Sequence, residues 1–334
     1  MRWLVGLLAL AVAGSACSSG PAAGRTAPSR TPARATQAPE PTAAPTPVPT
    51  PPLPPYFVES LRARPYPGGQ LQVGDAMFGG PGFTKYHVSW PSGGQTMTGT
   101  ISLPDGSGPF PVVVVNHGFI PPERYWIGQD SGIFGDPMAA HGFISVAPNW
   151  PGYSGSGPAP ADLPPIVGQV VTALDLVSSL RTLPQADTSR IAFVGHSNGG
   201  GIAEIAMVVD PRVRAVVLQA PVSSDMADNA RKWWLQTPTS LAGLGSPDAN
   251  PDGYRHLSPR GYFAAGQPPV LIVQGTADHT IPADWTNATY AALQQRGVES
   301  KLLWVPGGDH DLVGANLDSA VAAQEAWIRH AFGT

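Results

Sequence analysis

Residues 191–201 read Ile-Ala-Phe-Val-Gly-His-Ser-Asn-Gly-Gly-Gly, so an apolar run leads directly into the pattern Gly-x-Ser-x-Gly at residues 195–199. This pattern places a serine on a tight turn between a strand and a helix, where glycines let the two elements pass closely. Residues 202–209 continue as a helix, whose N-terminus favours negative charge at the serine. The pattern also arises by chance in a chain with 39 glycines, so Ser197 must have partners elsewhere to be a nucleophile.

A serine nucleophile needs a histidine as its base and a carboxylate that orients the histidine. In one fold these residues follow the chain order serine, acid, histidine. Asp278 follows a buried-type apolar run at residues 268–275, and His310 lies in a glycine-rich loop after a strand at residues 301–305. Polar groups at the carboxyl ends of parallel strands meet at one edge of a sheet. We therefore predict that Ser197, Asp278 and His310 form a catalytic triad.

Four polar residues near these positions have other interpretations. Asp225 follows the strand after the nucleophile and is the second candidate for the acid. His279 is interpreted as a loop residue, because it would share one turn with its own orienting acid. Asp309 and Asp311 flank His310 and are interpreted as loop charges or as support for the histidine.

An oxyanion hole uses the backbone N–H after the nucleophile and a second N–H from the loop after an earlier strand. A β-branched strand ends here in Asn-His-Gly-Phe at residues 116–119. We assign the two donors to Asn198 and Phe119, with Gly118 as the alternative to Phe119. His117 is expected to brace this loop rather than to transfer protons.

Together these residues resemble the α/β-hydrolase superfamily, over residues 73–333. Four segments are similar to its dienelactone hydrolase and prolyl oligopeptidase branch: residues 116–119, 148–157, 257–259 and 307–310. The resemblance implies hydrolysis through an acyl-enzyme on the serine. Polyester hydrolases of the cutinase type are similar in outline, but they usually carry methionine after the nucleophile and a disulfide, whereas this chain has Asn198 and one cysteine.

Alternating strands and helices predict an α/β fold, with a mostly parallel central sheet covered by helices on both faces. The other predicted strands are 70–73, 85–90, 95–103, 142–147 and 213–219, and the other predicted helices are 166–183, 283–296 and 317–332. The alternation breaks down at residues 221–266, which predicts a small cap-like insertion over the site. Trp150, Tyr153, Trp233 and Trp234 are candidates for an apolar substrate pocket.

The first residues are typical of an exported protein. A basic residue precedes an apolar run at residues 3–13, which is too short to span a bilayer. Cys17, the only cysteine, follows Gly-Ser-Ala, and this resembles the lipoprotein signal of bacteria, with glycine where leucine is usual. We expect residues 1–17 to be a signal peptide with a lipidated Cys17, which holds the protein on the outer face of a bacterial cell membrane. A cut before Cys17 without lipidation, and hence secretion, is the alternative.

Residues 18–55 consist largely of Pro, Ala, Thr and Ser, and this composition predicts an extended, disordered linker. Residues 56–334 then form one catalytic domain. The net charge is −4, from 19 basic and 23 acidic residues, and no basic stripe indicates a nucleic-acid partner. The sequence has no phosphate loop, dinucleotide fingerprint or Cys/His metal spacing, so we expect no cofactor and no metal. The oligomeric state stays open.

The sequence therefore predicts an exported serine esterase that acts on small-molecule or polymeric esters. The first alternative is a prolyl oligopeptidase-type peptidase that uses the same residues. It ranks second because the sequence shows neither a propeller-length N-terminal domain nor an acidic pair that would hold an amino terminus. The alternative from another class is a non-catalytic surface binding protein on the same fold, against which the intact triad argues.

Overall fold

The computed structural model describes residues 52–237, 241 and 243–334 of the chain. Its elements are α1 (Val58–Ala63), β1 (Gln72–Gly80), β2 (Phe83–Ser92), β3 (Gln95–Pro104), β4 (Phe110–Asn116), α2 (Ser131–Ala140), β5 (Ile144–Pro148), α3 (Pro165–Ser179), β6 (Ala186–His196), α4 (Asn198–Val209), β7 (Val213–Gln219), α5 (Met226–Lys232), α6 (Pro251–Leu257), β8 (Val270–Gly275), α7 (Ala283–Gln295), β9 (Ser300–Val305) and α8 (Ala315–Phe332). The predicted signal peptide, Cys17 and most of the predicted linker lie outside the described residues. No helix in the described ranges is long and apolar enough to cross a membrane.

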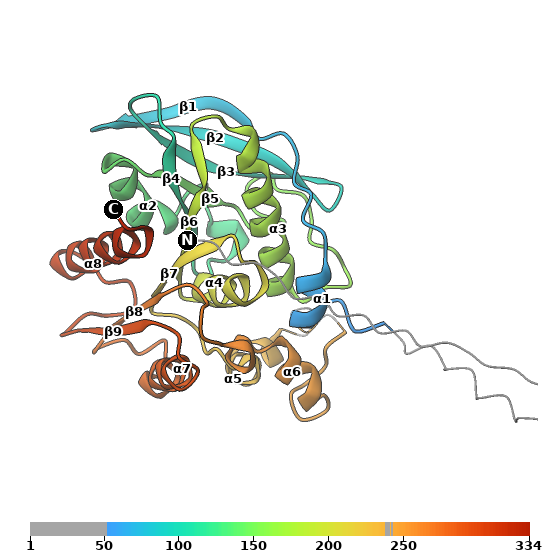
Figure 1. Ribbon diagram of the computed structural model, residues 1–334. Coiled ribbons are helices and arrows are strands. Elements are labelled where there is room, and N and C mark those ends of the chain that lie inside the picture. Colours follow the sequence, from blue (N-terminus) through green and yellow to red (C-terminus); the bar gives the residue numbers. More distant parts are fainter. Residues whose placement is uncertain (1–51, 238–240, 242) are drawn as a thin grey trace, which may run out of the picture. The chain divides into compact units, whose positions relative to one another are not determined.

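The strands form one sheet in the order β1-β2-β3-β5-β4-β6-β7-β8-β9 (Figure 1). Strands β1, β2 and β3 pair antiparallel, and β3 pairs antiparallel with β5. From β5 through β4, β6, β7 and β8 to β9 every pairing is parallel. The carboxyl ends of these six strands therefore share one edge of the sheet.

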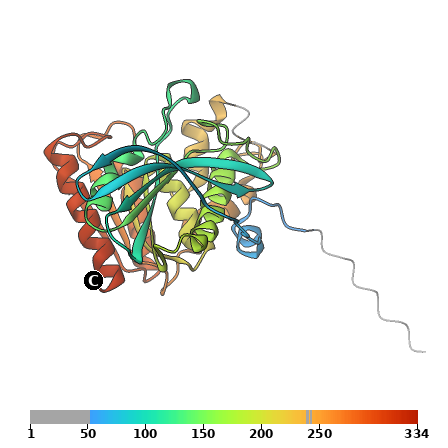
Figure 2. The ribbon, with the colours of Figure 1, turned by 90° about the horizontal axis from the view of Figure 1, so that it is seen from above.

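The sheet separates two apolar cores. Val112 and Val114 of β4 pack into one core, and Val113 and Val115 pack into the other, because side chains alternate along a strand. Helices α1, α3 and α4 cover the first core, and α2 and α8 cover the second (Figure 2). Parallel strands buried on both faces explain the uninterrupted valine run of β4. This confirms the predicted fold class.

Two elements differ from the sequence prediction. The first strand was predicted at residues 70–73, but β1 runs from Gln72 to Gly80. It is an edge strand with mostly exposed residues, so it has little of the apolar alternation on which the prediction depends. No feature of the sequence predicts α2, because it contains Gly132, Gly135 and Pro137, which are poor helix formers.

The chain between β7 and β8 leaves the alternation of strands and helices, as the sequence predicts. It forms α5, a short 3-10 helix at Trp234–Gln236, α6 and a second 3-10 helix at Pro259–Tyr262. Asp225 begins α5 by accepting a hydrogen bond from the N–H of Ala227 at 3.0 Å. This segment carries Trp233 and Trp234, and so supplies one wall of the site.

Candidate active site

The turn between β6 and α4 holds Ser197 in a strained backbone conformation. Its φ of 52° and ψ of −117° are unusual for a residue with a side chain. The surrounding chain fixes this conformation, because the Ser197 N–H donates to the carbonyl of Gln219 at 2.9 Å. The Ser197 carbonyl accepts from the N–H groups of Gly200 at 2.9 Å and Val222 at 3.1 Å. The serine side chain is thereby held at the carboxyl edge of the sheet.

The glycines on either side of Ser197 are required by close backbone contacts. A Cβ on Gly195 would collide with the carbonyl oxygen of Gly199, and a Cβ on Gly199 would collide with that of Asn116. Strand β4, strand β6 and the start of α4 therefore approach each other too closely for any side chain. This is the steric reason for the glycine spacing in the sequence pattern.

Asp278 and His310 form a hydrogen-bonded pair. The Nδ1 atom of His310 lies 2.9 Å from Oδ2 of Asp278, whose side chain is completely buried. The same carboxylate accepts hydrogen bonds from Gln274 Nε2 at 2.7 Å and from the N–H groups of Thr280 at 2.7 Å and Ile281 at 3.0 Å. Four donors thus fix the orientation of the carboxylate.

These contacts also set the charge and the tautomer of the pair. Burial alone would raise the pKa of Asp278, but the hydrogen bonds from His310 and the backbone outweigh burial and hold the pKa below its usual value. An ionised carboxylate only accepts hydrogen bonds, so the Nδ1 atom of His310 carries a proton. In the neutral ring Nε2 is then unprotonated and available as a base.

Two loops are joined side by side to bring this pair together. The N–H of Ala277 donates to the carbonyl of Gly308 at 2.8 Å, and the N–H of Thr276 donates to that of Val305 at 3.0 Å. A Cβ on Gly275 would collide with the Gly308 carbonyl, so the close approach requires glycine there. The loop after β8 therefore positions the loop after β9.

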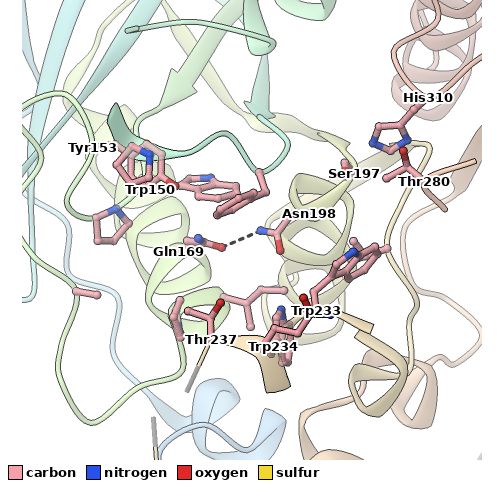
Figure 3. Close-up of a pocket in the computed structure, with 18 residues that line it drawn as sticks. Trp150, Tyr153, Gln169, Ser197, Asn198, Trp233, Trp234, Thr237, Thr280 and His310 are labelled. Atoms are coloured by element: carbon pink, nitrogen blue, oxygen red, sulfur yellow. Dashed lines mark hydrogen bonds between the residues drawn. The ribbon is translucent and has the colours of Figure 1, made fainter. Parts of the chain in front are cut away.

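A cavity of about 750 Å³ opens beside the serine (Figure 3). Its wall includes Ser197, His310 and the two assigned oxyanion residues, Phe119 and Asn198. All four aromatic residues suggested by the sequence also line it: Trp150, Tyr153, Trp233 and Trp234. Within the described residues the Ser197 hydroxyl makes no hydrogen bond, and such contacts often tighten only when substrate is bound.

The alternative residues near the predicted triad have other partners or are exposed. Asp225 caps α5 and lies 3.6 Å from the guanidinium of Arg260. His279 and Asp311 are exposed, and Asp309 accepts a hydrogen bond from the N–H of Leu312 at 2.9 Å. Of the two candidate acids, only Asp278 is hydrogen-bonded to His310.

The structure also distinguishes the two candidate donors of the oxyanion loop. The N–H of Gly118 donates to Oδ2 of Asp130 at 2.6 Å and is therefore occupied. Within the described residues neither the N–H of Phe119 nor that of Asn198 has a hydrogen-bond partner. Asn198 is the first residue of α4, so its N–H belongs to the positive end of a helix. This geometry favours Phe119 and Asn198 as the pair of donors.

His117 is buried in a stack of aromatic rings rather than facing the serine. Its ring lies 4.2 Å from that of Trp150 and 4.6 Å from that of Tyr125, measured between centroids. Burial lowers its pKa to about 4, so the ring is neutral at pH 7. The hydroxyl of Tyr153 donates to the carbonyl of Ile120 at 2.9 Å and holds the other end of the loop.

Sequence reasoning missed two polar side chains that bear on the site. Gln169 of α3 lines the cavity, and its Oε1 accepts a hydrogen bond from Nδ2 of Asn198 at 3.1 Å (Figure 3). A lone amide on an otherwise apolar helix face was the signal that could have identified it. Asp130 has no such signal, because it lies in a loop and its contacts are distant in sequence.

Three side chains have ligand atoms close enough for a metal ion: His196, His310 and Asp311 have one atom each within 4.8 Å of the others. Both ring nitrogens of His196 are already hydrogen-bonded, to Asp130 and to the backbone carbonyl of His310. The Nδ1 atom of His310 is bonded to Asp278. Only one ring nitrogen of the group is unoccupied, so this donor set does not suit a metal.

The sequence matches a known family over most of the catalytic region. The family model described as "Prolyl oligopeptidase family" matches residues 136–334. Dipeptidyl-peptidase 5 of Porphyromonas gingivalis is 28% identical over 187 residues, which are 52% of this chain and 26% of that protein. An uncharacterized protein of Pseudomonas aeruginosa is 33% identical over 129 residues, which are 37% of this chain and 33% of that protein. The chain thus spans a third or less of the curated relatives it matches.

Solved structures with similar folds include both esterases and peptidases. Acetyl xylan esterase 1 from Thermoanaerobacterium sp. aligns with a TM-score of 0.61 and 18% identity, over 82% of this chain and 91% of that one. Acylaminoacyl peptidase of Pyrococcus horikoshii aligns with a TM-score of 0.59 and 20% identity, over 74% of this chain and 41% of that one. At these identities the likeness establishes the fold alone, which is that of the α/β-hydrolases.

Proposed function

Because the chain belongs to the prolyl oligopeptidase family, we propose that it is a serine hydrolase that cleaves carboxylic esters. Ser197 Oγ attacks the ester carbonyl while Nε2 of His310 takes its proton, and Asp278 stabilises the resulting imidazolium. The N–H groups of Phe119 and Asn198 donate to the oxyanion. His310 then protonates the departing alcohol, and water activated by the same histidine releases the acid from the acyl-enzyme.

The neutral lining of the cavity is the observation that carries the choice of ester. Among the described residues that line it there is no Asp, Glu, Lys or Arg. A substrate with a charged amino terminus or carboxylate would therefore lose hydration in the cavity without gaining an ion pair, and this costs free energy. Uncharged acyl and alcohol groups fit aromatic walls such as those of Trp150 and Trp233.

The amide pair in the cavity favours peptidase activity as the second candidate. Gln169 and Asn198 together offer both donors and acceptors beside Ser197, which is what a peptide group needs. The neutral lining would then select blocked or internal peptides rather than free amino termini. The third candidate, a binding protein without catalysis, predicts no turnover of any ester or anilide by the wild type.

One assay separates these three candidates. The purified protein is tested with p-nitrophenyl esters from acetate to decanoate and with aminoacyl and prolyl p-nitroanilides, and Ser197→Ala serves as the blank. We expect turnover of esters, abolished by Ser197→Ala in a protein that keeps its circular dichroism. Faster turnover of anilides would put the peptidase first, and turnover that survives in Ser197→Ala would refute the mechanism.

We also propose that the protein is exported and anchored by a lipid on Cys17. The support is in the sequence alone: an apolar run at residues 3–13 precedes the only cysteine of the chain. In a bacterial host the wild type should enter the detergent phase of a Triton X-114 extract. The Cys17→Ser variant should stay in the aqueous phase. Equal partitioning of the wild type and the variant would exclude lipidation.

A further inference from the structure

His196 precedes the nucleophile and forms a second histidine–aspartate pair in the site. It is 4% exposed, and its Nδ1 atom lies 2.9 Å from each carboxylate oxygen of Asp130. Its Nε2 atom lies 3.1 Å from the backbone carbonyl oxygen of His310. Figure 3 places Ser197, the next residue, beside His310 in the same view.

Both partners of the His196 ring are hydrogen-bond acceptors. A carboxylate and a backbone carbonyl have no proton to donate, so each contact requires an N–H on the ring. A neutral imidazole has only one N–H, and would leave one of these two contacts without a proton. The two contacts are satisfied together only by an imidazolium.

The backbone of Asp130 is consistent with a role in the site. It stands at the N-terminal end of α2, where an aspartate usually caps the helix, but its side chain makes no capping bond. Its φ of 66° turns the carboxylate toward His196 and the Gly118 N–H instead. A residue with a side chain rarely adopts this conformation, and does so only where the surroundings enforce it.

The pair connects three segments that carry the proposed chemistry. Asp130 holds the peptide N–H of Gly118, next to the oxyanion donor of Phe119. His196 holds the carbonyl of His310, the proposed base. Since His196 also adjoins Ser197 in the chain, this partly buried pair connects the oxyanion loop, the proposed base and the proposed nucleophile.

The other charged and titratable groups around His196 are compatible with a positive ring. His117 is neutral, and Asp311, which is exposed, adds negative charge. His310 lies 4.8 Å away between ring centroids and has its own carboxylate, Asp278. Burial alone would lower the pKa of His196, but the facing Asp130 outweighs burial and holds the pKa above its usual value.

We propose that His196 is a positioning residue, held as an imidazolium by Asp130, that fixes the base and the oxyanion loop relative to Ser197. It transfers no proton in the reaction, because both of its N–H groups are engaged. Only the expected effect of His196 on the reaction rate depends on the proposed function. The protonation state itself is independent of any activity.

The direct test is ¹⁵N NMR of the histidine rings in the full-length Ser197→Ala protein, across pH 5 to 8. We expect both ring nitrogens of His196 to be protonated at pH 7, which lies above the usual pKa of a histidine ring. His117 is the internal reference for a buried neutral ring, with one proton. A single proton on the His196 ring at pH 7 would overturn the proposal.

Kinetics test the consequence. Asp130→Asn removes the charge, and we expect kcat to fall about 10- to 100-fold with KM changed less than about threefold, because a misplaced base slows the chemical step. The same variant should show His196 with one ring proton at pH 7. His87→Gln, at an exposed position of β2, is the matched control and should leave kcat unchanged. Unchanged kcat in Asp130→Asn would contradict the role in positioning.

If no ester or anilide is turned over even by the wild type, the proposed function fails while the NMR result still decides the charge of His196.

Discussion

The N–H of Gly118 donates to the carboxylate of Asp130 at 2.6 Å, whereas the next N–H in the loop, that of Phe119, has no hydrogen-bond partner among the described residues. Sequence alone allowed either residue to be the donor. The choice follows from a carboxylate that comes from the start of α2. The proposed pair of oxyanion donors therefore depends on a contact that lies outside the proposed oxyanion hole.

Replacing Phe119 with proline removes the proposed donor. We expect kcat to fall about 100- to 1000-fold, the usual effect of losing one oxyanion donor. Phe119→Ala keeps the N–H and removes the 68% exposed ring, so it should change kcat only a few-fold. Ester kinetics of the two variants provide the measurement, and equal losses in both would show that the ring matters rather than the N–H.

The substitution Asp278→Asn should prevent His310 from acting as a base. Asp278→Asn replaces an acceptor with a donor opposite His310 Nδ1, so the ring no longer holds the required tautomer, and kcat should fall about 10³- to 10⁴-fold. Asp225→Asn keeps a capping oxygen for Ala227 and should stay within about twofold of the wild type. A larger loss in Asp225→Asn than in Asp278→Asn would reverse the assignment of the acid.

Gln169 should select acyl groups that carry a polar atom. Its amide lies in an aromatic cavity, and a purely hydrocarbon chain would cover it without a hydrogen bond. We expect Gln169→Leu to raise the preference for p-nitrophenyl hexanoate over the p-nitrophenyl ester of monomethyl succinate by about tenfold. Gln169→Met, which is closer in shape, should give the same shift in kcat/KM, and an unchanged ratio in both variants would exclude this role.

Glu204 of α4 should make the protein less stable as the pH rises. Its carboxyl group is completely buried, and neither oxygen has a hydrogen-bond partner among the described residues. Burial raises its pKa well above the usual value, although Arg260 opposes the shift. Between about pH 4.5 and the folded-state pKa the unfolded chain loses the proton and the folded protein keeps it. Stability then falls by up to about 1.4 kcal/mol per pH unit.

Glu204→Gln removes this dependence, so its stability relative to the wild type should increase from pH 5 to pH 8 in urea unfolding. Glu325→Gln is the matched control. Hydrogen bonds from Arg329 and His141 outweigh burial and hold the pKa of Glu325 below its usual value, so its contribution is constant from pH 5 to pH 8 and is lost only below about pH 4.5. The same trend in both variants would contradict the assignment to Glu204.

Much of the fold was predictable because its signals are local. The valine run of β4 and the apolar run of β8 mark strands buried on both faces. Strand β1 was misplaced because an exposed edge strand carries no such pattern, and α2 was missed because glycine and proline obscure it. Local sequence patterns do not predict an exposed edge strand such as β1, or a helix such as α2 that tertiary contacts stabilise despite its weak helix propensity.

The sequence by itself determined the α/β fold class, the strand-to-helix turn at Ser197 and the order of Ser197, Asp278 and His310, because each depends on a short pattern and on the shared edge of parallel strands. Only the tertiary structure decided which acid pairs with His310, which N–H of the oxyanion loop is free, and that Asp130 faces His196. The last two residues are 66 positions apart, and nothing in the neighbourhood of either one encodes the other. Their contact exists because α2 packs on β4 and β5, and β4 lies next to β6 in the sheet, so that the start of α2 reaches the edge where Ser197 also lies.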